Sequence, residues 1–255
     1  MTADVSPGSY DIAGPAAAPA IVFVHGTRLT RSSWTPQLKA LRDSFRVVAM
    51  DLPGHGALAD RPFSIAAASQ ELARVIESAA GGSAIVVGLS LGGYVGMDLA
   101  ATRPDLVRGL VLSGATQEPV GLLATPYLAL AWVMDRLDGR ALGGLNRWFF
   151  RTRYPPAIAD PIVAGGFFGA GGAGALRALI GERFAPRLAA YNGPVLILNG
   201  ELDLLFRAGA KGFARDARDV RRVRLAGATH LANLDRPEAF NMAVRRFAEE
   251  LQNRP

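Results

Sequence analysis

A serine flanked by glycines is the first feature of the sequence that could carry out chemistry. Ser90 lies in Gly88-Leu89-Ser90-Leu91-Gly92, which has the pattern G-x-S-x-G, after an apolar run typical of a buried strand and before a helical pattern. A serine on such a strained turn projects its hydroxyl above the sheet, and glycines remove side chains that would collide there. The N-terminus of the helix favours developing negative charge. We therefore predict Ser90 as a nucleophile.

A serine hydroxyl is a weak nucleophile without a base. The chain has three histidines, His25, His55 and His230. His230 follows the last predicted strand, and the loops at the ends of parallel strands gather at one edge of a sheet. We therefore predict His230 as the general base. His25 is expected to brace its own loop through hydrogen bonds, and His55 is expected to lie in a structural turn.

The base needs an acid that fixes its tautomer and stabilises the imidazolium. Asp203 follows a predicted strand through Asn199-Gly200-Glu201-Leu202, and it completes the chain order serine, aspartate, histidine. Glu201 is a competing carboxylate in the same loop. Asp51 also follows a strand, but it precedes the serine. We predict Asp203 as the acid.

Backbone N–H groups hold the oxyanion in acyl transfer, so position matters more than residue identity. We assign the two donors to Leu91, directly after the nucleophile, and to Thr27, in the loop after the first buried strand. The predicted site is therefore the triad of Ser90, Asp203 and His230 with an oxyanion hole at Thr27 and Leu91. This site implies no metal and no organic cofactor.

These residues need a scaffold that brings the ends of strands together. Continuous apolar runs predict strands at Ala20–Val24, Phe45–Met50, Ala84–Val87, Leu106–Leu112, Pro194–Leu198 and Val220–Leu225. Helical patterns lie at Trp34–Arg42, Ile65–Ser78, Leu91–Thr102 and Pro237–Leu251. Strands that alternate with helices in this way predict an α/β fold with a mostly parallel central sheet flanked by helices.

The alternation stops between residues 116 and 190, where apolar helical pieces occur without strand runs. We predict one domain, with a core at 1–115 and 191–255 and a helical cap insertion at 116–190. Pro119–Met134 has no charged residue and is apolar on several faces, so the cap predicts a small to medium, mostly apolar substrate. Aromatic residues nearby are expected to add to this lining: Trp148, Phe149, Phe150, Phe167 and Phe168.

Two features of the cap bear on how it would work. Glycines are concentrated at positions 165, 166, 169, 171, 172 and 174, and they are expected to let part of the cap move and gate the site. Three arginines leave an alternative for the substrate open. If Arg147, Arg151 or Arg153 points inward, the site would bind a carboxylate, as an anionic lactone needs.

Composition limits the other functions of the 255-residue chain. It has no cysteine, which excludes a disulfide framework, a thiolate zinc site and a cysteine nucleophile. The N-terminus lacks a signal-peptide pattern and the longest apolar stretch is too short to span a membrane, so a cytoplasmic protein is expected. The net charge is +6, but the arginines of 218–224 are interleaved with acids, so nucleic-acid binding is not expected.

Five short motifs together resemble the α/β-hydrolase superfamily over nearly the whole chain. They are HG-T-R from His25, D-L-P-G-H-G from Asp51, G-L-S-L-G-G from Gly88, N-G-E-L-D from Asn199 and G-A-T-H-L from Gly227. The residues from His230 to Phe240 are similar to endings of enol-lactonases and cofactor-free haloperoxidase-like esterases. A serine nucleophile disfavours haloalkane dehalogenases and epoxide hydrolases, which use aspartate there. Leu231 replaces the tryptophan that many ring-fission C–C hydrolases carry.

The resemblance and the predicted triad imply a serine hydrolase that cleaves a carboxylic ester or lactone through an acyl-enzyme. Its expected partner is a small-molecule substrate, with no nucleic acid and no membrane. A C–C bond hydrolase or a perhydrolase on the same triad is an alternative. A small-molecule binding protein of this fold with low turnover is another, because fold does not fix function. The sequence predicts no oligomeric state.

Overall fold

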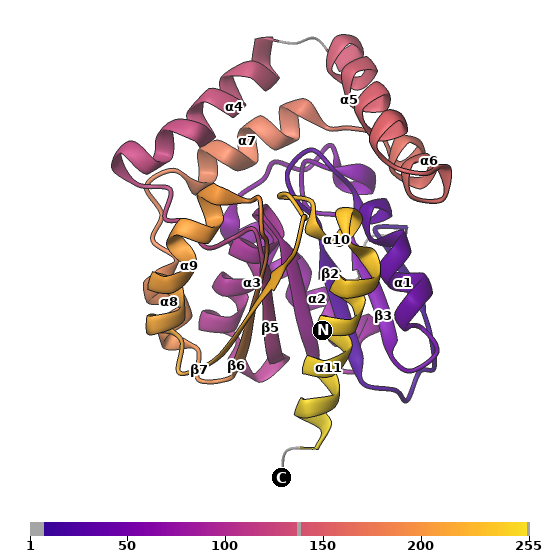
Figure 1. Cartoon of the computed structure of the whole chain (residues 1–255), viewed down its shortest axis with the longest axis vertical. Coiled ribbons are helices and arrows are strands. Elements are labelled where there is room, and N and C mark those ends of the chain that lie inside the picture. The colour runs from indigo at the N-terminus through magenta and orange to yellow at the C-terminus, as the bar shows by residue number, and fades with distance from the viewer. Residues whose placement is uncertain (1–7, 137–138, 254–255) are drawn as a thin grey trace.

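A single mixed sheet forms the centre of the molecule. The computed structural model describes residues 8–136 and 139–253, and within them seven strands pair in the order β1-β3-β2-β4-β5-β6-β7 (Figure 1). Only β1 is antiparallel to its neighbour among these described strands. The bounds are Tyr10–Ala13 (β1), Ala20–Val24 (β2), Arg46–Met50 (β3), Ala84–Leu89 (β4), Val107–Ser113 (β5), Pro194–Gly200 (β6) and Asp219–Leu225 (β7). The predicted α/β class with a mostly parallel sheet is confirmed.

The edge strand β1 was not predicted from the sequence. Its four residues lack a buried apolar run, because two of them are exposed and two are half-buried. By contrast, the predicted strands β2 and β4 are buried along their whole length. Burial on both faces gives the continuous apolar pattern by which such strands are recognised.

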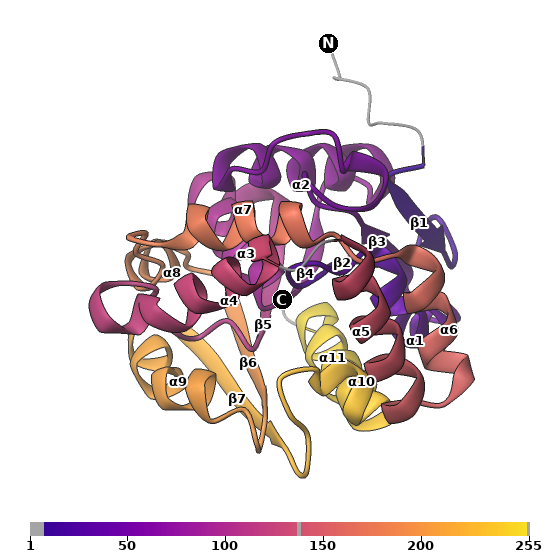
Figure 2. The same cartoon turned by 90° about the horizontal axis from the view of Figure 1, so that it is seen from above.

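Successive residues of the buried strands pack into different cores on the two faces of the sheet. In β2, Val22 and Val24 belong to one core, whereas Ile21 and Phe23 belong to the other. The first core is covered by α2 (Ile65–Ala79), α3 (Leu91–Thr102), α8 (Ala185–Ala190) and α9 (Leu204–Asp216). The second is covered by α1 (Thr35–Leu41), α10 (Ala232–Asp235) and α11 (Pro237–Gln252), and Figure 2 shows the two groups on opposite sides.

Four further helices lie over one end of the sheet (Figure 1). We call them the cap helices: α4 (Thr125–Arg136), α5 (Gly139–Arg153), α6 (Pro156–Gly165) and α7 (Gly169–Leu179). Helix α4 packs along α7, and α5 packs against α6. By contrast, α8 packs against α3 and α9 beside the sheet. The division into a core and a cap at 116–190 stays a prediction.

No single helix in the described ranges is both long and apolar enough to cross a bilayer. Helices α6 and α7 reach that length and composition only as a pair, and they are bent by 86° relative to each other.

Candidate active site

Ser90 lies on a sharp turn between β4 and α3. Its backbone has φ 51° and ψ −114°, a conformation that side-chain-bearing residues rarely adopt and that costs about 1–3 kcal/mol. Two hydrogen bonds hold the turn: the N–H of Ser90 donates to Ser113 O at 2.7 Å, and the N–H of Gly93 donates to Ser90 O at 2.9 Å. The strained turn exposes the serine hydroxyl at the end of β4, as a nucleophile requires.

The glycines around Ser90 are required by close backbone contacts. A Cβ on Gly88 would overlap the backbone of Gly92, and a Cβ on Gly92 would overlap the carbonyl oxygen of Val24. A Cβ on Gly93 would overlap the side chain of Ala115. The strand, the turn and the helix can therefore approach each other only because these positions carry no side chain.

The predicted base and acid are in direct contact. The Nδ1–H of His230 donates to Asp203 Oδ2 over 2.9 Å. Asp203 begins α9 after β6 and is buried, whereas the side chain of His230 is 37% exposed and lines a cavity with Ser90. A carboxylate on Nδ1 leaves Nε2 free to accept a proton. The ring of Phe206 stacks on His230 with centroids 4.9 Å apart, which further fixes the imidazole.

The competing carboxylates make other contacts. Glu201 accepts the backbone N–H of Gly227 at 2.9 Å. Asp51 is buried, and it accepts the N–H groups of Arg31 and Ala57 and forms an ion pair with the Arg31 guanidinium. Asp203 is therefore the carboxylate that the structure brings to His230.

Gly114 is a part of the site that the sequence analysis missed. It follows β5 with φ 58°, and a Cβ there would lie 2.6 Å from Cε1 of His230. Its N–H donates to the side chain of Asn199 at 2.9 Å, and the Asn199 amide donates to Thr116 Oγ1 at 3.1 Å. The Ser113-Gly114 pair at the end of a predicted strand was the available signal. This buried network holds the backbone of Gly114 against the imidazole of His230.

The loop from Gly26 to Arg28 lies next to Ser90. A Cβ on Gly26 would be 3.5 Å from Cβ of Ser90, so this loop and the start of α3 border the same point. Arg28 has φ 58°, and its N–H donates to Nε2 of His55 at 3.1 Å. The loop therefore has a fixed, strained backbone on the side of Ser90 where Thr27 is the predicted oxyanion donor.

Two neutral histidines, His25 and His55, hold the loop from Gly26 to Arg28 through hydrogen bonds. The Nε2 of His25 accepts the N–H of Leu52 at 3.0 Å, and its Nδ1–H donates to Gly26 O at 2.8 Å. The Nδ1–H of His55 donates to Pro53 O at 3.0 Å. Burial lowers the pKa of His25 to about 4, and burial together with the neighbouring His25 lowers the pKa of His55 to about 3. Both rings therefore act as uncharged braces.

A cavity of about 210 Å³ opens between this site and the cap helices. Ser90, His230 and Thr27 lie at its polar end, and Arg28 and Tyr127 are the other polar residues of its wall. The remaining wall is mostly apolar: Leu29, Leu89, Pro126, Leu130, Phe150, Leu176, Leu205, Phe206 and Leu231. Such a cavity removes an apolar group from water and leaves the reacting group next to the polar residues.

Comparisons with known proteins agree with this geometry. The sequence profile of the alpha/beta hydrolase family matches residues 21–243. The chain belongs to the alpha/beta hydrolase family. Like other members, it is therefore a hydrolytic enzyme, and enol-lactonases are among its relatives, as its motifs indicated.

Three individual proteins illustrate the relationship of this hydrolase to others. It is 28% identical to 2-(acetamidomethylene)succinate hydrolase of Mesorhizobium japonicum, across 96% of this chain and 94% of that protein. It is 24% identical to 3-oxoadipate enol-lactonase 1 of Acinetobacter baylyi, across 96% and 94%. The crystal structure of the enol-lactonase from Burkholderia xenovorans LB400 superposes with a TM-score of 0.79 at 25% identity, covering 94% of this chain and 95% of that chain.

The cap of this hydrolase contributes fewer residues to the cavity than its composition suggested. The cap residues of the wall are Pro126, Tyr127 and Leu130 of α4, Phe150 of α5 and Leu176 of α7. Other apolar residues of the cap are exposed on its outer surface, namely Leu122, Leu123, Trp132, Val133 and Trp148. Phe149 and Phe167 pack into a small separate core, and Leu137 lies outside the described residues.

The three cap arginines of the hydrolase lie away from the cavity. Arg153 forms an ion pair with Asp235 at 2.8 Å and donates to the hydroxyl of Tyr154. Arg151 is 4.0 Å from Asp160, and Arg147 is exposed. The alternative in which one of these three points inward does not apply, and Arg28, from the loop beside Ser90, is the arginine of the cavity wall.

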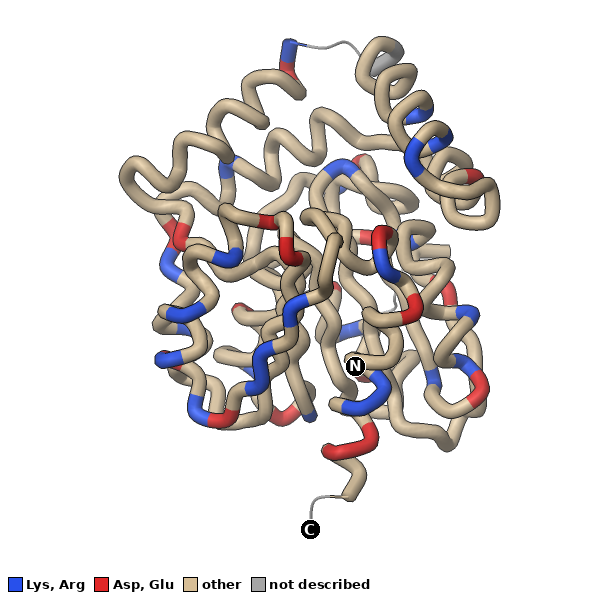
Figure 3. The backbone as a smooth tube through the Cα atoms, viewed as in Figure 1, with Lys and Arg blue, Asp and Glu red and all other residues tan. Residues whose placement is uncertain are grey.

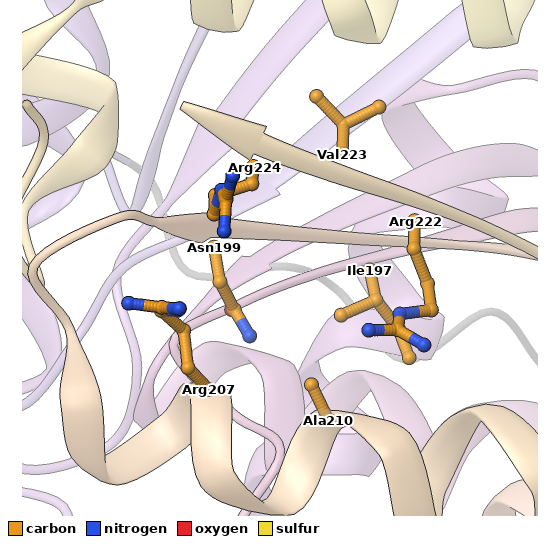
Figure 4. Close-up of a pocket in the computed structure, with 7 residues that line it drawn as sticks. All are labelled: Ile197, Asn199, Arg207, Ala210, Arg222, Val223 and Arg224. Carbon is orange, nitrogen blue, oxygen red and sulfur yellow. The ribbon is translucent and has the colours of Figure 1, made fainter. Parts of the chain in front are cut away.

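A second cavity, of about 470 Å³, lies between β7 and α9 (Figure 4). Arg222 and Arg224 of β7 and Arg207 of α9 project around it, and basic positions follow one another along β7 (Figure 3). Arg221 of the same strand is instead paired with Asp219 and Glu250.

The described residues contain no group of three or more His, Cys, Asp or Glu arranged to hold a metal.

Proposed function

We propose that this hydrolase is a serine enzyme that cleaves a carboxylic ester or lactone of a small to medium, mostly apolar substrate through an acyl-enzyme. The observation that carries the proposal is the hydrogen bond of 2.9 Å from His230 Nδ1 to Asp203, in a cavity that also exposes Ser90. The similarity to 3-oxoadipate enol-lactonase 1 and to 2-(acetamidomethylene)succinate hydrolase supports hydrolysis of an acyl compound.

In this mechanism, Ser90 Oγ attacks the substrate carbonyl while His230 Nε2 takes its proton. The backbone N–H groups of Thr27 and Leu91 stabilise the oxyanion, because they are fixed donors and need no reorganisation as the charge develops. His230 then protonates the leaving group, and the acyl-enzyme remains. A water that gives its proton to His230 attacks the acyl carbonyl and releases Ser90.

A fluorophosphonate probe tests the proposal directly. The probe is expected to attach covalently to Ser90 in the native protein, as located by mass spectrometry of peptides. Ser90→Ala should lose the label and reduce kcat for activated esters by a factor on the order of 10⁴ or more, while the circular dichroism spectrum stays the same. Labelling at another residue, or undiminished turnover by Ser90→Ala, contradicts the proposal. Turnover of a vinylogous diketone but not of esters would instead indicate the C–C hydrolase.

A further inference from the structure

Arg28 lines the wall of the active-site cavity, and among the described residues its guanidinium has no acidic partner. The residue is partly buried and lines the cavity with Ser90 and His230. Its backbone is engaged, since its N–H donates to His55 and its carbonyl accepts the N–H of Phe168 at 3.0 Å. Among residues 8–136 and 139–253, its side chain has no hydrogen bond and no ion pair.

Other partly buried arginines have a partner for the guanidinium: some pair with carboxylates, and others, such as Arg46 and Arg207, donate to backbone carbonyls. Arg31 is paired with Asp11 and Asp51. Arg187 is paired with Asp98 at 3.3 Å and with Glu182 at 2.6 Å. A cation removed from water is destabilising unless an anion or a set of hydrogen-bond acceptors compensates for the lost hydration. Arg28 differs from these arginines, because its side chain has neither a carboxylate nor a carbonyl partner among the described residues.

The charge of Arg28 persists in this position. Burial lowers the pKa of its guanidinium, but the ordinary value is so far above neutrality that the group stays protonated. A guanidinium offers a planar pair of N–H donors that matches the two oxygens of a carboxylate. An incoming carboxylate would supply both the missing charge and the missing acceptors.

The backbone of Arg28 is held in one place relative to the reacting groups. It directly follows Thr27, whose Oγ1 donates to Gly172 O at 3.2 Å. A Cβ on Gly172 would be 3.2 Å from the Arg28 nitrogen, so α7 packs closely on this peptide. A group bound by Arg28 would therefore lie beside the loop that also carries Thr27, the predicted oxyanion donor.

We propose that Arg28 binds a carboxylate of the substrate, so that the preferred substrate is an ester or lactone whose acyl part carries one negative charge. This inference rests on the proposed function and names its substrate class. The single cation fits a carboxylate, and the otherwise apolar wall, with Leu29, Leu130 and Leu176, fits the hydrocarbon part of the acyl chain. Arg28 thereby determines specificity, while Ser90 and His230 carry the reaction.

Matched esters test this assignment by kinetics. Nitrophenyl hexanoate and the mono-nitrophenyl ester of adipate have the same leaving group and equal acyl chains, and only the second ends in a carboxylate. The wild type is expected to have the higher kcat/KM for the adipate ester. In Arg28→Met the ratio of the two kcat/KM values should fall by about 10- to 100-fold, as expected for loss of a charge-assisted hydrogen bond. Arg28→Lys should retain part of the ratio, and Arg147→Met, at an exposed position of α5, should leave the ratio unchanged.

Binding without turnover separates this inference from the proposed function. In the Ser90→Ala background, calorimetry with monomethyl adipate and with methyl hexanoate should show tighter binding of the anion, and Arg28→Met should remove that difference. If no ester is hydrolysed but the binding preference is present, the proposed function fails and the carboxylate site stands. If the wild type binds and cleaves both probes equally, or if Arg28→Met weakens both equally, the carboxylate site is wrong. Circular dichroism checks the fold, and Arg28→Gln replaces Arg28→Met if that variant does not fold.

Discussion

Gly54 and Gly171 meet backbone to backbone, and this contact fastens cap helix α7 to the turn after β3. A Cβ on Gly54 would lie 3.1 Å from the Cα of Gly171, and a Cβ on Gly171 would overlap the carbonyl oxygen of Gly54. A Cβ on Gly165 would similarly lie 2.5 Å from Thr30 Oγ1, and one on Gly169 would lie 2.5 Å from Leu142 Cδ2. Several glycines that the sequence analysis assigned to cap motion therefore serve close packing.

The contact predicts opposite effects of alanine at two glycines of α7. Gly171→Ala should destabilise the protein by about 1–3 kcal/mol, because the added methyl must displace backbone. Gly174→Ala should stabilise it by up to about 1 kcal/mol, because alanine favours a helix and nothing lies within 4 Å of the added Cβ. Urea unfolding of both variants measures the difference. Equal stability of the two would contradict the packing role.

Gly114→Ala is expected to impair catalysis through His230. The new Cβ would be 2.6 Å from the imidazole Cε1, so the ring must move, and a displacement of about 1 Å can reduce kcat about 100-fold. Gly121→Ala is the matched control, since Gly121 has φ 56°, close to the 58° of Gly114, and nothing lies within 4 Å of its Cβ. The control reproduces the backbone strain without the collision. A similar kcat for both variants would show that the ring is not displaced.

Asp203→Asn should reduce kcat by a factor on the order of 10³–10⁴, because an amide no longer stabilises the imidazolium or fixes the Nδ1–H tautomer. Glu201→Gln should have a mild effect, since its contact is with the backbone N–H of Gly227 and an amide oxygen can still accept it. Steady-state kinetics on one activated ester compares the two neutral replacements. The reverse ranking would move the acid to Glu201.

The stability of the protein should fall as the pH is lowered from about 6.5 to about 4. His25 and His55 have their pKa lowered to about 4 and about 3 in the folded state, so the unfolded chain binds more protons in this range. Each histidine then contributes a slope of up to about 1.4 kcal/mol per pH unit, and neither contributes above the unfolded pKa. His55→Gln should reduce the slope measured by urea unfolding at several pH values. An unchanged slope would mean that His55 does not stay neutral when folded.

The sequence predicted the parts of the molecule that depend on local pattern. Buried strands such as β2 are continuously apolar, and α3 was predicted with both of its ends because Ser90 and its glycines mark the start. The positions of Asp203 and His230 follow from the rule that strand ends gather at one edge. Their mutual contact is the outcome of the fold, and the hydrogen bond of 2.9 Å agrees with the predicted pair.

Features that depend on contacts across the chain were not predictable. Nothing local distinguishes Arg28 from Arg151, because its position in the cavity depends on His55 and Phe168, which lie far away in the sequence. Gly171 looks like any glycine of a flexible segment until Gly54 is placed against it. The burial of a cap side chain likewise depends on the rotation of its helix, so Leu130 and Trp132 point in different directions although both are apolar.

The attachment of α7 has a consequence for how this enzyme could diversify. Helix α7 contacts Gly54 and Thr27, so a substitution that shifts it also disturbs the loop beside Ser90. Helices α4 and α5 supply Tyr127, Leu130 and Phe150 to the cavity, whereas Leu176 is the cavity residue of α7. Natural variation in substrate preference is therefore expected to accumulate in α4 and α5, while the positions of α7 that face Gly54 and Thr27 tolerate little change. Libraries aimed at new substrates should be randomised in α4 and α5 and leave α7 intact.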